Sequence, residues 1–234
     1  MRDAVLTDLP GHIDISCVQA QHDLDDLRRL AALAREHRFV AAHVLPNWVP
    51  VMRDLLDGAS TLTGSPVGFP SGGPTTATKV AEATELLELG AQELDVVAPI
   101  GRLRSGDTDY AVRELRAVVD AVDGRVPLRV ILEVGHLDDD TIRAGVDAAL
   151  EAGVPWIKTG TGWSGIPTTL AHIELIAQRT AGRAKLKAAG GIRDLDTITR
   201  MAELGVTRFG MNSAAAVAVV TASAPSPAAE EVVA

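Results

Sequence analysis

The chain of 234 residues is predicted to fold as a single (β/α)8 barrel, also called a TIM barrel, of the α/β class. Short apolar runs alternate with longer segments whose apolar residues recur at helical spacing, and eight such units follow one another. No linker-like stretch divides them, and barrels of this length commonly form one domain. A doubly wound open sheet is the structural alternative, but eight regular units without a linker favour the closed barrel.

The predicted strands are the short apolar runs. In chain order they cover His12–Ile15, Val40–Leu45, Ser65–Phe69, Glu93–Ala98, Leu128–Val134, Pro155–Thr159, Ala184–Ala189 and Thr207–Met211. Several intervening helices begin with an acid whose side chain can accept hydrogen bonds from the first N–H groups of the helix. These N-caps are Asp23, Asp138 and Asp194. The turns before three of the strands contain a glycine suited to positive φ, namely Gly90, Gly153 and Gly205.

The barrel is expected to occupy residues 1–220 as one domain. Residues 221–234 are rich in Ala, Ser and Pro and carry Glu230 and Glu231 near the end, which predicts a flexible C-terminal tail.

Composition excludes several classes of function. A net charge of -9 argues against nucleic acid or an acidic membrane surface as the main partner, and 3% aromatic residues leave little to stack on bases. The single cysteine, Cys17, excludes an internal disulfide and a multi-cysteine metal site. The start of the chain lacks an apolar signal region, and no run of about eighteen apolar residues could span a bilayer. A cytoplasmic enzyme is therefore expected.

Only four lysines occur in the chain, and three of them lie in two apolar, strand-like runs. Lysine, unlike arginine, can lose its proton when it is desolvated or placed near another cation, and a neutral amine forms a Schiff base with carbonyls. Lys158 and Lys187 come at the ends of their runs, whereas Lys185 is deeper or at the lower rim and is expected to be structural. Lys79 is expected to be a helix-surface charge. The alternative is that Lys158 and Lys187 are strand-end lysines that extend their amines to water.

Barrel active sites lie at the C-terminal ends of the strands. The residues that this rule brings to one face are Asp14, His43, Asp95, Glu133, Lys158 and Lys187. Two ammonium groups facing each other lower the pKa of one of them, and a carboxylate such as Asp95 can hold water and shuttle protons. These parts are what a Schiff-base aldolase requires, without a metal or cofactor. The alternative is a structural ion pair between Asp95 and one lysine.

Glycines after the last three strands predict a phosphate site. They lie in Gly160-Thr161-Gly162, in Gly190-Gly191, and at Gly210 ahead of Asn212-Ser213. Barrels often bind phosphate with these loops and a helix N-terminus, because glycine lets backbone N–H groups approach the anion. Arg193 and Arg208 are expected to add positive charge. Turn geometry alone is the alternative explanation for the glycines.

The sequence resembles the deoxyribose-phosphate aldolases, a family of class I aldolases. The stretches that carry the resemblance run over residues 11–220 and are Val67-Gly68-Phe69-Pro70 with Gly73-Pro74-Thr75-Thr76, Glu93-Leu94-Asp95-Val96-Val97, Ile157-Lys158-Thr159-Gly160-Thr161-Gly162, Lys187-Ala188-Ala189-Gly190-Gly191-Ile192-Arg193 and Arg208-Phe209-Gly210. The family's reaction is the reversible cleavage of 2-deoxy-D-ribose 5-phosphate to acetaldehyde and D-glyceraldehyde 3-phosphate.

The resemblance also implies roles for individual residues. Lys158 is the Schiff-base lysine, Lys187 the second lysine that lowers its pKa, and Asp95 the acid/base that acts through water. Asp14 supports the site. The residues in the family's phosphate-binding stretches are Gly162, Gly190, Gly191, Arg193, Gly210 and Ser213.

The chain departs from the family pattern on the substrate-facing side. The family's Asp-His-Thr-Leu-Leu stretch is Asp14-Ile15-Ser16-Cys17-Val18, and its cysteine after the second strand is His43. A Ser-Ser pair becomes Asn212-Ser213, and the only tyrosine, Tyr110, lies in a helix rather than at the C-terminus. His43 is either an added acid/base or, as we favour, a polar side chain that fills space.

These departures keep two alternatives open. The first is an aldolase of the same mechanism on a different, possibly unphosphorylated, substrate; the second is a non-catalytic barrel that binds phosphosugars. Substrate contacts are also expected from Ser16, His43, Thr161 and Asn212. The expected partner is a small aldehyde or sugar phosphate, and the chain is expected to form a homodimer.

Overall fold

The protein forms a closed barrel of eight parallel strands, here seen in a computed structural model that describes residues 2–223. The strands are β1 (Ile13–Cys17), β2 (Ala41–Val44), β3 (Leu62–Val67), β4 (Glu93–Val97), β5 (Leu128–Ile131), β6 (Trp156–Lys158), β7 (Lys185–Ala189) and β8 (Val206–Met211). Each strand pairs with the next in the chain, and Asp14 of β1 lies beside Gly210 of β8 where the barrel closes. The predicted (β/α)8 fold is confirmed.

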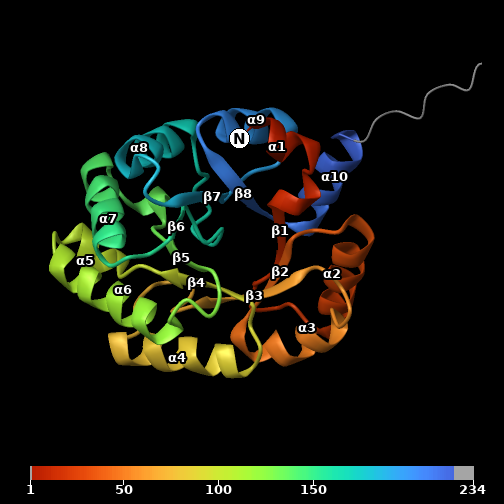
Figure 1. The fold of residues 1–234 in the computed structure, drawn as a ribbon, viewed down its shortest axis with the longest axis horizontal. Coiled ribbons are helices and arrows are strands. Elements are labelled where there is room, and N and C mark those ends of the chain that lie inside the picture. The colour runs from red at the N-terminus through yellow and green to blue at the C-terminus, as the bar shows by residue number, and fades with distance from the viewer. Residues whose placement is uncertain (1, 224–234) are drawn as a thin grey trace, which may run out of the picture.

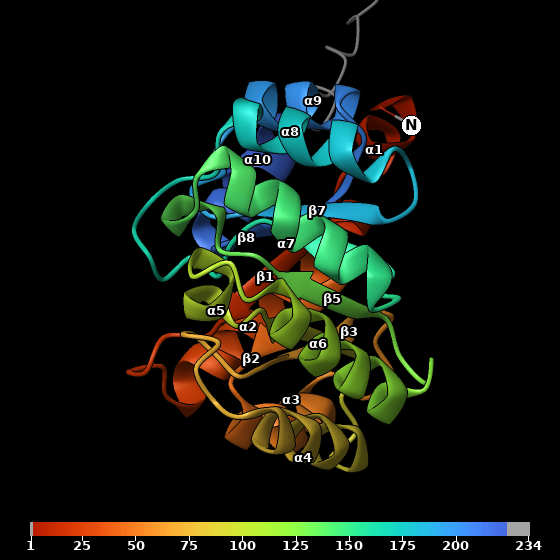
Figure 2. The same cartoon turned by 90° about the vertical axis from the view of Figure 1, so that its left-hand side faces the viewer.

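Helices surround the barrel as an outer ring (Figure 1). They are α1 (Arg2–Thr7), α2 (Leu24–His37), α3 (Val49–Leu55), α4 (Thr76–Glu88), α5 (Ile100–Arg104), α6 (Thr108–Val122), α7 (Asp139–Glu151), α8 (Leu170–Thr180), α9 (Leu195–Glu203) and α10 (Ser213–Ser223). The short α1 lies beside α9 in both views (Figure 1, Figure 2), and Arg2 pairs with Glu203 there at 3.1 Å. Three-residue 3-10 turns precede β1, precede α3 and follow β5.

The helix boundaries follow the local signals in the sequence. Asp23, Asp138 and Asp194 each accept hydrogen bonds from first-turn N–H groups as N-caps. The three glycines before strands have positive φ, as predicted, at Gly90, Gly153 and Gly205. The α10 helix continues to Ser223, so residues 221–223 are helical rather than tail, and the rest of the predicted tail lies outside the described residues.

The main hydrophobic core lies between the barrel and the helices. Leu27 and Leu30 of α2 and Val118 of α6 are buried there together with the outward-facing strand residues. Much of the inside of the barrel is instead polar and charged, although such interiors are usually filled by branched apolar side chains. The fold therefore places a group of ionisable residues at its centre. In the range 2–223, no helix is both long enough and apolar enough to cross a membrane.

Candidate active site

A cavity of about 440 Å³ opens at the C-terminal ends of the strands. Fourteen of the residues predicted to form the site line it: Asp14, Ser16, His43, Asp95, Lys158, Thr161, Gly162, Lys187, Gly190, Gly191, Arg193, Gly210, Asn212 and Ser213. Glu133 and Arg208, which were also expected there, do not line it. The fourteen come from different strands and loops, and barrel closure brings them together. Their individual roles remain predictions.

Two lysines share one carboxylate oxygen. Lys158 Nζ lies 2.8 Å and Lys187 Nζ 2.9 Å from Asp95 Oδ2. Their strands are neighbours, with Lys158 opposite Lys187 in the register of β6 and β7. The Lys158 side chain is 11% exposed and the Lys187 side chain only 1%, so Lys158 presents the more accessible amine to the cavity.

Asp95 is an ionised acid at the centre of this group. Burial opposes its ionisation, but Lys158 and Lys187 outweigh burial and hold the pKa of Asp95 well below its ordinary value. Its second oxygen accepts a hydrogen bond of 3.1 Å from Arg129. A carboxylate that contacts both amines can carry a proton from one to the other.

Lys187 is surrounded by acceptors and by a histidine. Its Nζ lies 2.5 Å from Asp14 Oδ2 and 3.3 Å from His43 Nε2, in addition to the contact with Asp95. Burial lowers the pKa of Lys187 although Asp14 and Asp95 oppose this shift, and the charge of Lys158 lowers it further.

An ionic network forms the floor of the site, and two of its members, Glu93 and Arg129, were not among the predicted site residues. Arg129 Nη2 donates to Glu93 Oε2 at 2.8 Å, and Arg208 bonds both Glu93 and Asp14. One signal could have revealed Glu93: residues two apart in a strand share a face, so Glu93 points into the barrel with Asp95. The register also places Arg129 beside Asp95.

Two expectations about cations were wrong. Arg208 does not supply charge to the phosphate loops, because its guanidinium faces the barrel interior and pairs with Asp14 and Glu93. Lys79 is not a surface charge: it is fully buried, pairs with Glu114 and donates to the Val97 carbonyl at 2.8 Å. Lys185 agrees with its structural assignment, since it is exposed at the start of β7 with its amine 5.1 Å from the Trp156 ring centre.

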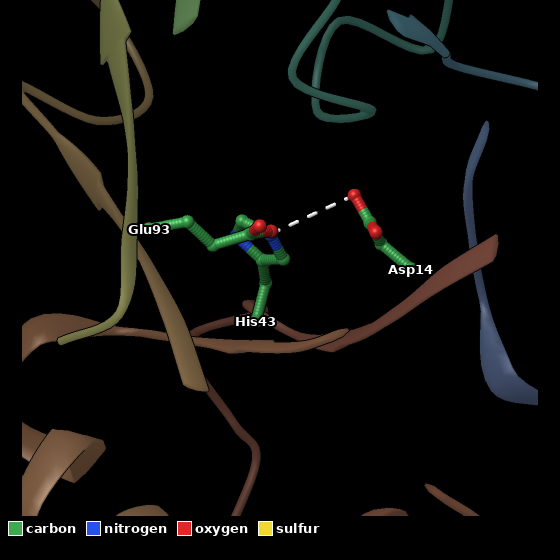
Figure 3. A group of neighbouring side chains, drawn as sticks. All are labelled: Asp14, His43 and Glu93. Carbon is green, nitrogen blue, oxygen red and sulfur yellow. Dashed lines mark hydrogen bonds and ion pairs between the residues drawn. The ribbon is translucent and has the colours of Figure 1, made fainter. Parts of the chain in front are cut away.

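Asp14, His43 and Glu93 converge from three strands and together resemble a metal-ligand set (Figure 3). Their potential ligand atoms all lie within 4.8 Å of one another. The same atoms already face cations, because Lys187 and Arg208 pair with Asp14, and Arg129 and Arg208 pair with Glu93. A metal ion would have to displace those charges, so the group fits an ion-pair network better than a metal site.

The comparisons with known proteins agree with this geometry. The chain is 53% identical over 94% of its length to a deoxyribose-phosphate aldolase of Sinorhizobium medicae, covering 89% of that protein. It is 44% identical over 87% of its length to one of Klebsiella pneumoniae, covering 82% of that protein. The chain belongs to the deoxyribose-phosphate aldolase family.

A solved structure leads to the same family. The tetrameric deoxyribose phosphate aldolase of Aeropyrum pernix superposes with a TM-score of 0.84 at 28% identity, over 93% of this chain and 91% of that one. No family model matches the chain.

In this aldolase, contacts with neighbouring segments hold the loop after β6. Glu133 leaves β5 in a left-handed conformation with φ 56° and accepts hydrogen bonds from the Thr161 amide and hydroxyl. The Thr161 hydroxyl hydrogen is therefore directed to Glu133, on the loop after β5. Trp163 Nε1 donates to the Val18 carbonyl at 3.0 Å, and its ring packs edge-on against Phe69 at 5.6 Å.

The predicted phosphate end of the aldolase site lies at the start of α10. Asn212 caps this helix by accepting a hydrogen bond of 2.8 Å from the Ala215 amide. Asn212 and Ser213 line the cavity, as do Gly190 and Gly191, which both have positive φ. The N-terminus of α10 and the glycine turn thus lie together at this end of the cavity.

Proposed function

We propose that Lys158 is the nucleophile of a class I aldolase that reversibly cleaves 2-deoxy-D-ribose 5-phosphate to acetaldehyde and D-glyceraldehyde 3-phosphate. The observation that carries this assignment is that Lys158 shares Asp95 with a second lysine and is the more exposed of the two amines at the cavity. Membership of the aldolase family supports the reaction.

The chemistry follows from a neutral amine beside a proton carrier. Lys158 attacks the C1 aldehyde, and loss of water gives an iminium ion. Removal of the proton from the C3 hydroxyl then lets the C2–C3 electron pair move toward the iminium carbon, which releases the phosphorylated aldehyde and leaves an enamine. Protonation at C2 and hydrolysis release acetaldehyde. Asp95 contacts both amines, which supports a role in moving these protons, and the proposed reaction needs no metal or cofactor.

The other end of the cavity is proposed to hold the phosphate. Backbone N–H groups of the glycine turns and of the α10 N-terminus suit a dianion, and Arg193 adds charge at the rim. The residues proposed for this role are Gly162, Gly190, Gly191, Arg193, Gly210, Asn212 and Ser213. Asp14 and Ser16 line the same cavity from β1.

Reductive trapping tests the assignment of the nucleophile. The protein is incubated with acetaldehyde or with the sugar phosphate, reduced with borohydride, digested and analysed by mass spectrometry. The adduct is expected on Lys158 and is expected to be lost in Lys158→Met. Lys185→Met is the matched control, because it removes an exposed lysine outside the cavity. An adduct on another lysine, or no adduct with any aldehyde, would overturn the mechanism.

A second candidate function keeps the mechanism and changes the substrate. Ser16, His43 and Asn212 depart from the family pattern and all line the cavity. Turnover of phosphorylated and unphosphorylated deoxyribose separates the two candidates: a strong preference for the phosphate rules out the unphosphorylated substrate. Ligand binding without turnover in the unaltered protein would instead indicate a non-catalytic barrel.

The working form of the protein is proposed to be a cytoplasmic homodimer that acts on small sugar phosphates and aldehydes. The structural relative from Aeropyrum pernix is described as tetrameric, which supports self-association but leaves the number of subunits to be measured. Light scattering coupled to gel filtration gives the mass. A monomer at working concentrations would contradict the proposal.

A further inference from the structure

Trp163 joins segments from opposite sides of the barrel mouth. It lies in the loop between β6 and α8, and its Nε1 donates to the carbonyl of Val18, just after β1, at 3.0 Å. Its ring also packs edge-on against Phe69, just after β3, with 5.6 Å between the ring centres. These contacts take no part in the reaction steps proposed above.

The order of the strands shows where the indole of Trp163 must lie. In the closed barrel, β7 and β8 separate β6 from β1 in one direction, and β5 and β4 separate β6 from β3 in the other. A loop that follows the rim from β6 reaches only one of these two strand ends. A single side chain that contacts the residues after both strands therefore extends across the mouth, toward the wall opposite β6.

Trp163 forms an outer layer over residues that line the cavity. Val18, Phe69 and the adjacent Gly162 are in the cavity wall. Trp163 itself is not in that wall and is 38% exposed, so it contacts Val18 and Phe69 from the solvent side. We call these four residues the roof. Beneath it, the Lys158 side chain is only 11% exposed.

Hydrogen bonds at both ends of the loop hold the roof in place. The Trp163 amide donates to the Thr161 hydroxyl at 2.9 Å, and that hydroxyl in turn donates to Glu133. Further along the loop, the Thr168 amide donates to the Gly190 carbonyl at 3.0 Å. The indole is therefore fixed by its own loop as well as by Val18.

The cavity has an opening away from the roof. Arg29 of α2 and Asn212, just before α10, are both exposed and both line the cavity. The two helices are neighbours, so this opening lies between them, at the predicted phosphate end. A substrate can enter there with its phosphate outermost while the roof stays closed.

We propose that Trp163 is a positioning residue: it holds Val18 and Phe69 together as a roof that limits the access of water to the enamine on Lys158. This inference rests on the proposed Schiff-base reaction. In the direction of synthesis, the enamine has two fates. Its C2 attacks the carbonyl carbon of the phosphorylated aldehyde, whose oxygen takes a proton, or C2 takes a proton itself. In the second fate, water then adds to the iminium carbon and the amine leaves, which returns acetaldehyde.

The roof favours the first fate because it keeps water scarce before the acceptor aldehyde has reacted. Bond formation to the acceptor uses only the enamine and the bound aldehyde, whereas the return of acetaldehyde consumes a proton from solvent and a water molecule. The indole thus affects which product forms rather than whether Lys158 reacts.

Deuterium exchange measures how the enamine divides between the two fates. The full chain is mixed with acetaldehyde and D-glyceraldehyde 3-phosphate in D2O, and NMR follows the initial rates of methyl deuteration and of aldol formation. In Trp163→Ala the ratio of deuteration to aldol product is expected to rise by about tenfold, because the roof opens. Trp163→Phe keeps a ring against Phe69 but loses the donor to Val18, so a rise of roughly threefold is expected.

Ile166→Ala is the matched control, because Ile166 is an exposed apolar residue of the same loop that does not line the cavity. Its ratio is expected to equal that of the unaltered protein. An unchanged ratio in Trp163→Ala, a parallel fall of both rates, or the same rise in Ile166→Ala rejects the role of Trp163. If Trp163→Ala does not fold, Trp163→Phe decides, and an unchanged ratio there rejects it.

The rate of borohydride reduction tests the access to the Schiff base independently of turnover. With the iminium formed beforehand from acetaldehyde, reduction is expected to be about threefold faster in Trp163→Ala than in the unaltered protein. Equal rates contradict the roof. A Lys158 adduct with an unchanged ratio rejects the role of Trp163 alone, whereas failure to trap Lys158 in the unaltered protein rejects the aldolase mechanism itself.

Discussion

Lys79 and Lys187 are both buried lysines with acidic partners, yet their surroundings differ. Lys79 is on α4, pairs with Glu114 of α6, donates to a backbone carbonyl and does not line the cavity. Lys187 faces two carboxylates and a histidine, and shares Asp95 with the more exposed Lys158 at a cavity of about 440 Å³. Burial lowers the pKa of both lysines, although Glu114 opposes the shift in Lys79.

A lowered lysine pKa is therefore a poor indicator of function by itself. Chemistry also needs access to a reactant and a second group that exchanges protons with the amine. The site provides both, whereas the Lys79 pair fastens α4 to the end of β4 and to α6. Substitutions in the two regions should therefore affect different measurements.

The largest effect is expected from Lys158→Met. Turnover should fall on the order of 10⁴-fold or more, because the nucleophile is lost. Stability should change little, since Asp95 keeps Lys187 and Arg129 as partners. Steady-state kinetics measure the turnover, and thermal unfolding measures the stability. Residual turnover within about tenfold of the unaltered protein would remove Lys158 from the mechanism.

Lys187→Met should reduce turnover by roughly 10²- to 10³-fold, the range for loss of a proton-transfer group. The amine of Lys158 remains, so borohydride should still trap it, but more slowly. Rapid-quench measurement of adduct formation checks this. If trapping in Lys187→Met proceeds at the normal rate, Lys187 takes no part in Schiff-base formation.

Lys79→Met should lower the free energy of unfolding by about 3–5 kcal/mol, because Glu114 is left as an unpaired buried charge. The kcat of the folded protein should stay within about twofold. The double variant Lys79→Met with Glu114→Leu should recover most of the stability, since apolar residues can replace a buried ion pair. Chemical denaturation measures the free energy of unfolding of the single and the double variant. A large loss of kcat in the folded single variant would break the contrast between the two regions.

The prediction with the smallest expected effect at neutral pH concerns the stability of the protein in acid. The pKa values of Asp95 and Glu93 are held well below their ordinary 3.8 and 4.5. A carboxyl group whose pKa is lower in the folded than in the unfolded protein contributes its full stabilisation above its unfolded-state pKa. This contribution is lost as the pH falls through its folded-state pKa. The free energy of unfolding should therefore be insensitive to these groups down to about pH 5 and decline below about pH 4.

Denaturation at a series of pH values checks this dependence, with Asp95→Asn as the comparison. The variant should lose stability at neutral pH and show a shallower decline in acid, because one of the titrating carboxylates is gone. Equal slopes in both proteins would mean that Asp95 does not contribute to the acid response.

Much of the fold could be predicted because its signals are local. The N-caps at Asp23, Asp138 and Asp194 and the positive-φ glycines act over a few residues, and the alternation of apolar runs with helical segments is read along the chain. Strand ends were predicted less accurately. The run Leu128–Val134 was predicted as one strand, but β5 ends at Ile131 and Glu133 has left the sheet to hold the loop after β6.

The candidate site was predictable to the extent that the barrel rule places strand ends together. That rule brings Asp95, Lys158 and Lys187 to one cavity without knowledge of their contacts. The assignments of Arg208 and Lys79 failed because sequence proximity and helical position say nothing about what packs over a side chain. Arg208 turns inward toward Asp14, a residue at the far end of the chain that barrel closure brings near.

Local signals in the amino-acid sequence account for the order of strands and helices, their caps and turns, and the positions of the few lysines at strand ends. Barrel closure was needed to bring opposite charges together, to bury Lys187 while Lys158 stays accessible, and to place His43, Gly64 and Glu93 side by side on neighbouring strands. The physical reason is that hydrogen-bond periodicity and capping act between near neighbours, whereas desolvation and charge pairing depend on distances that exist only after the barrel closes.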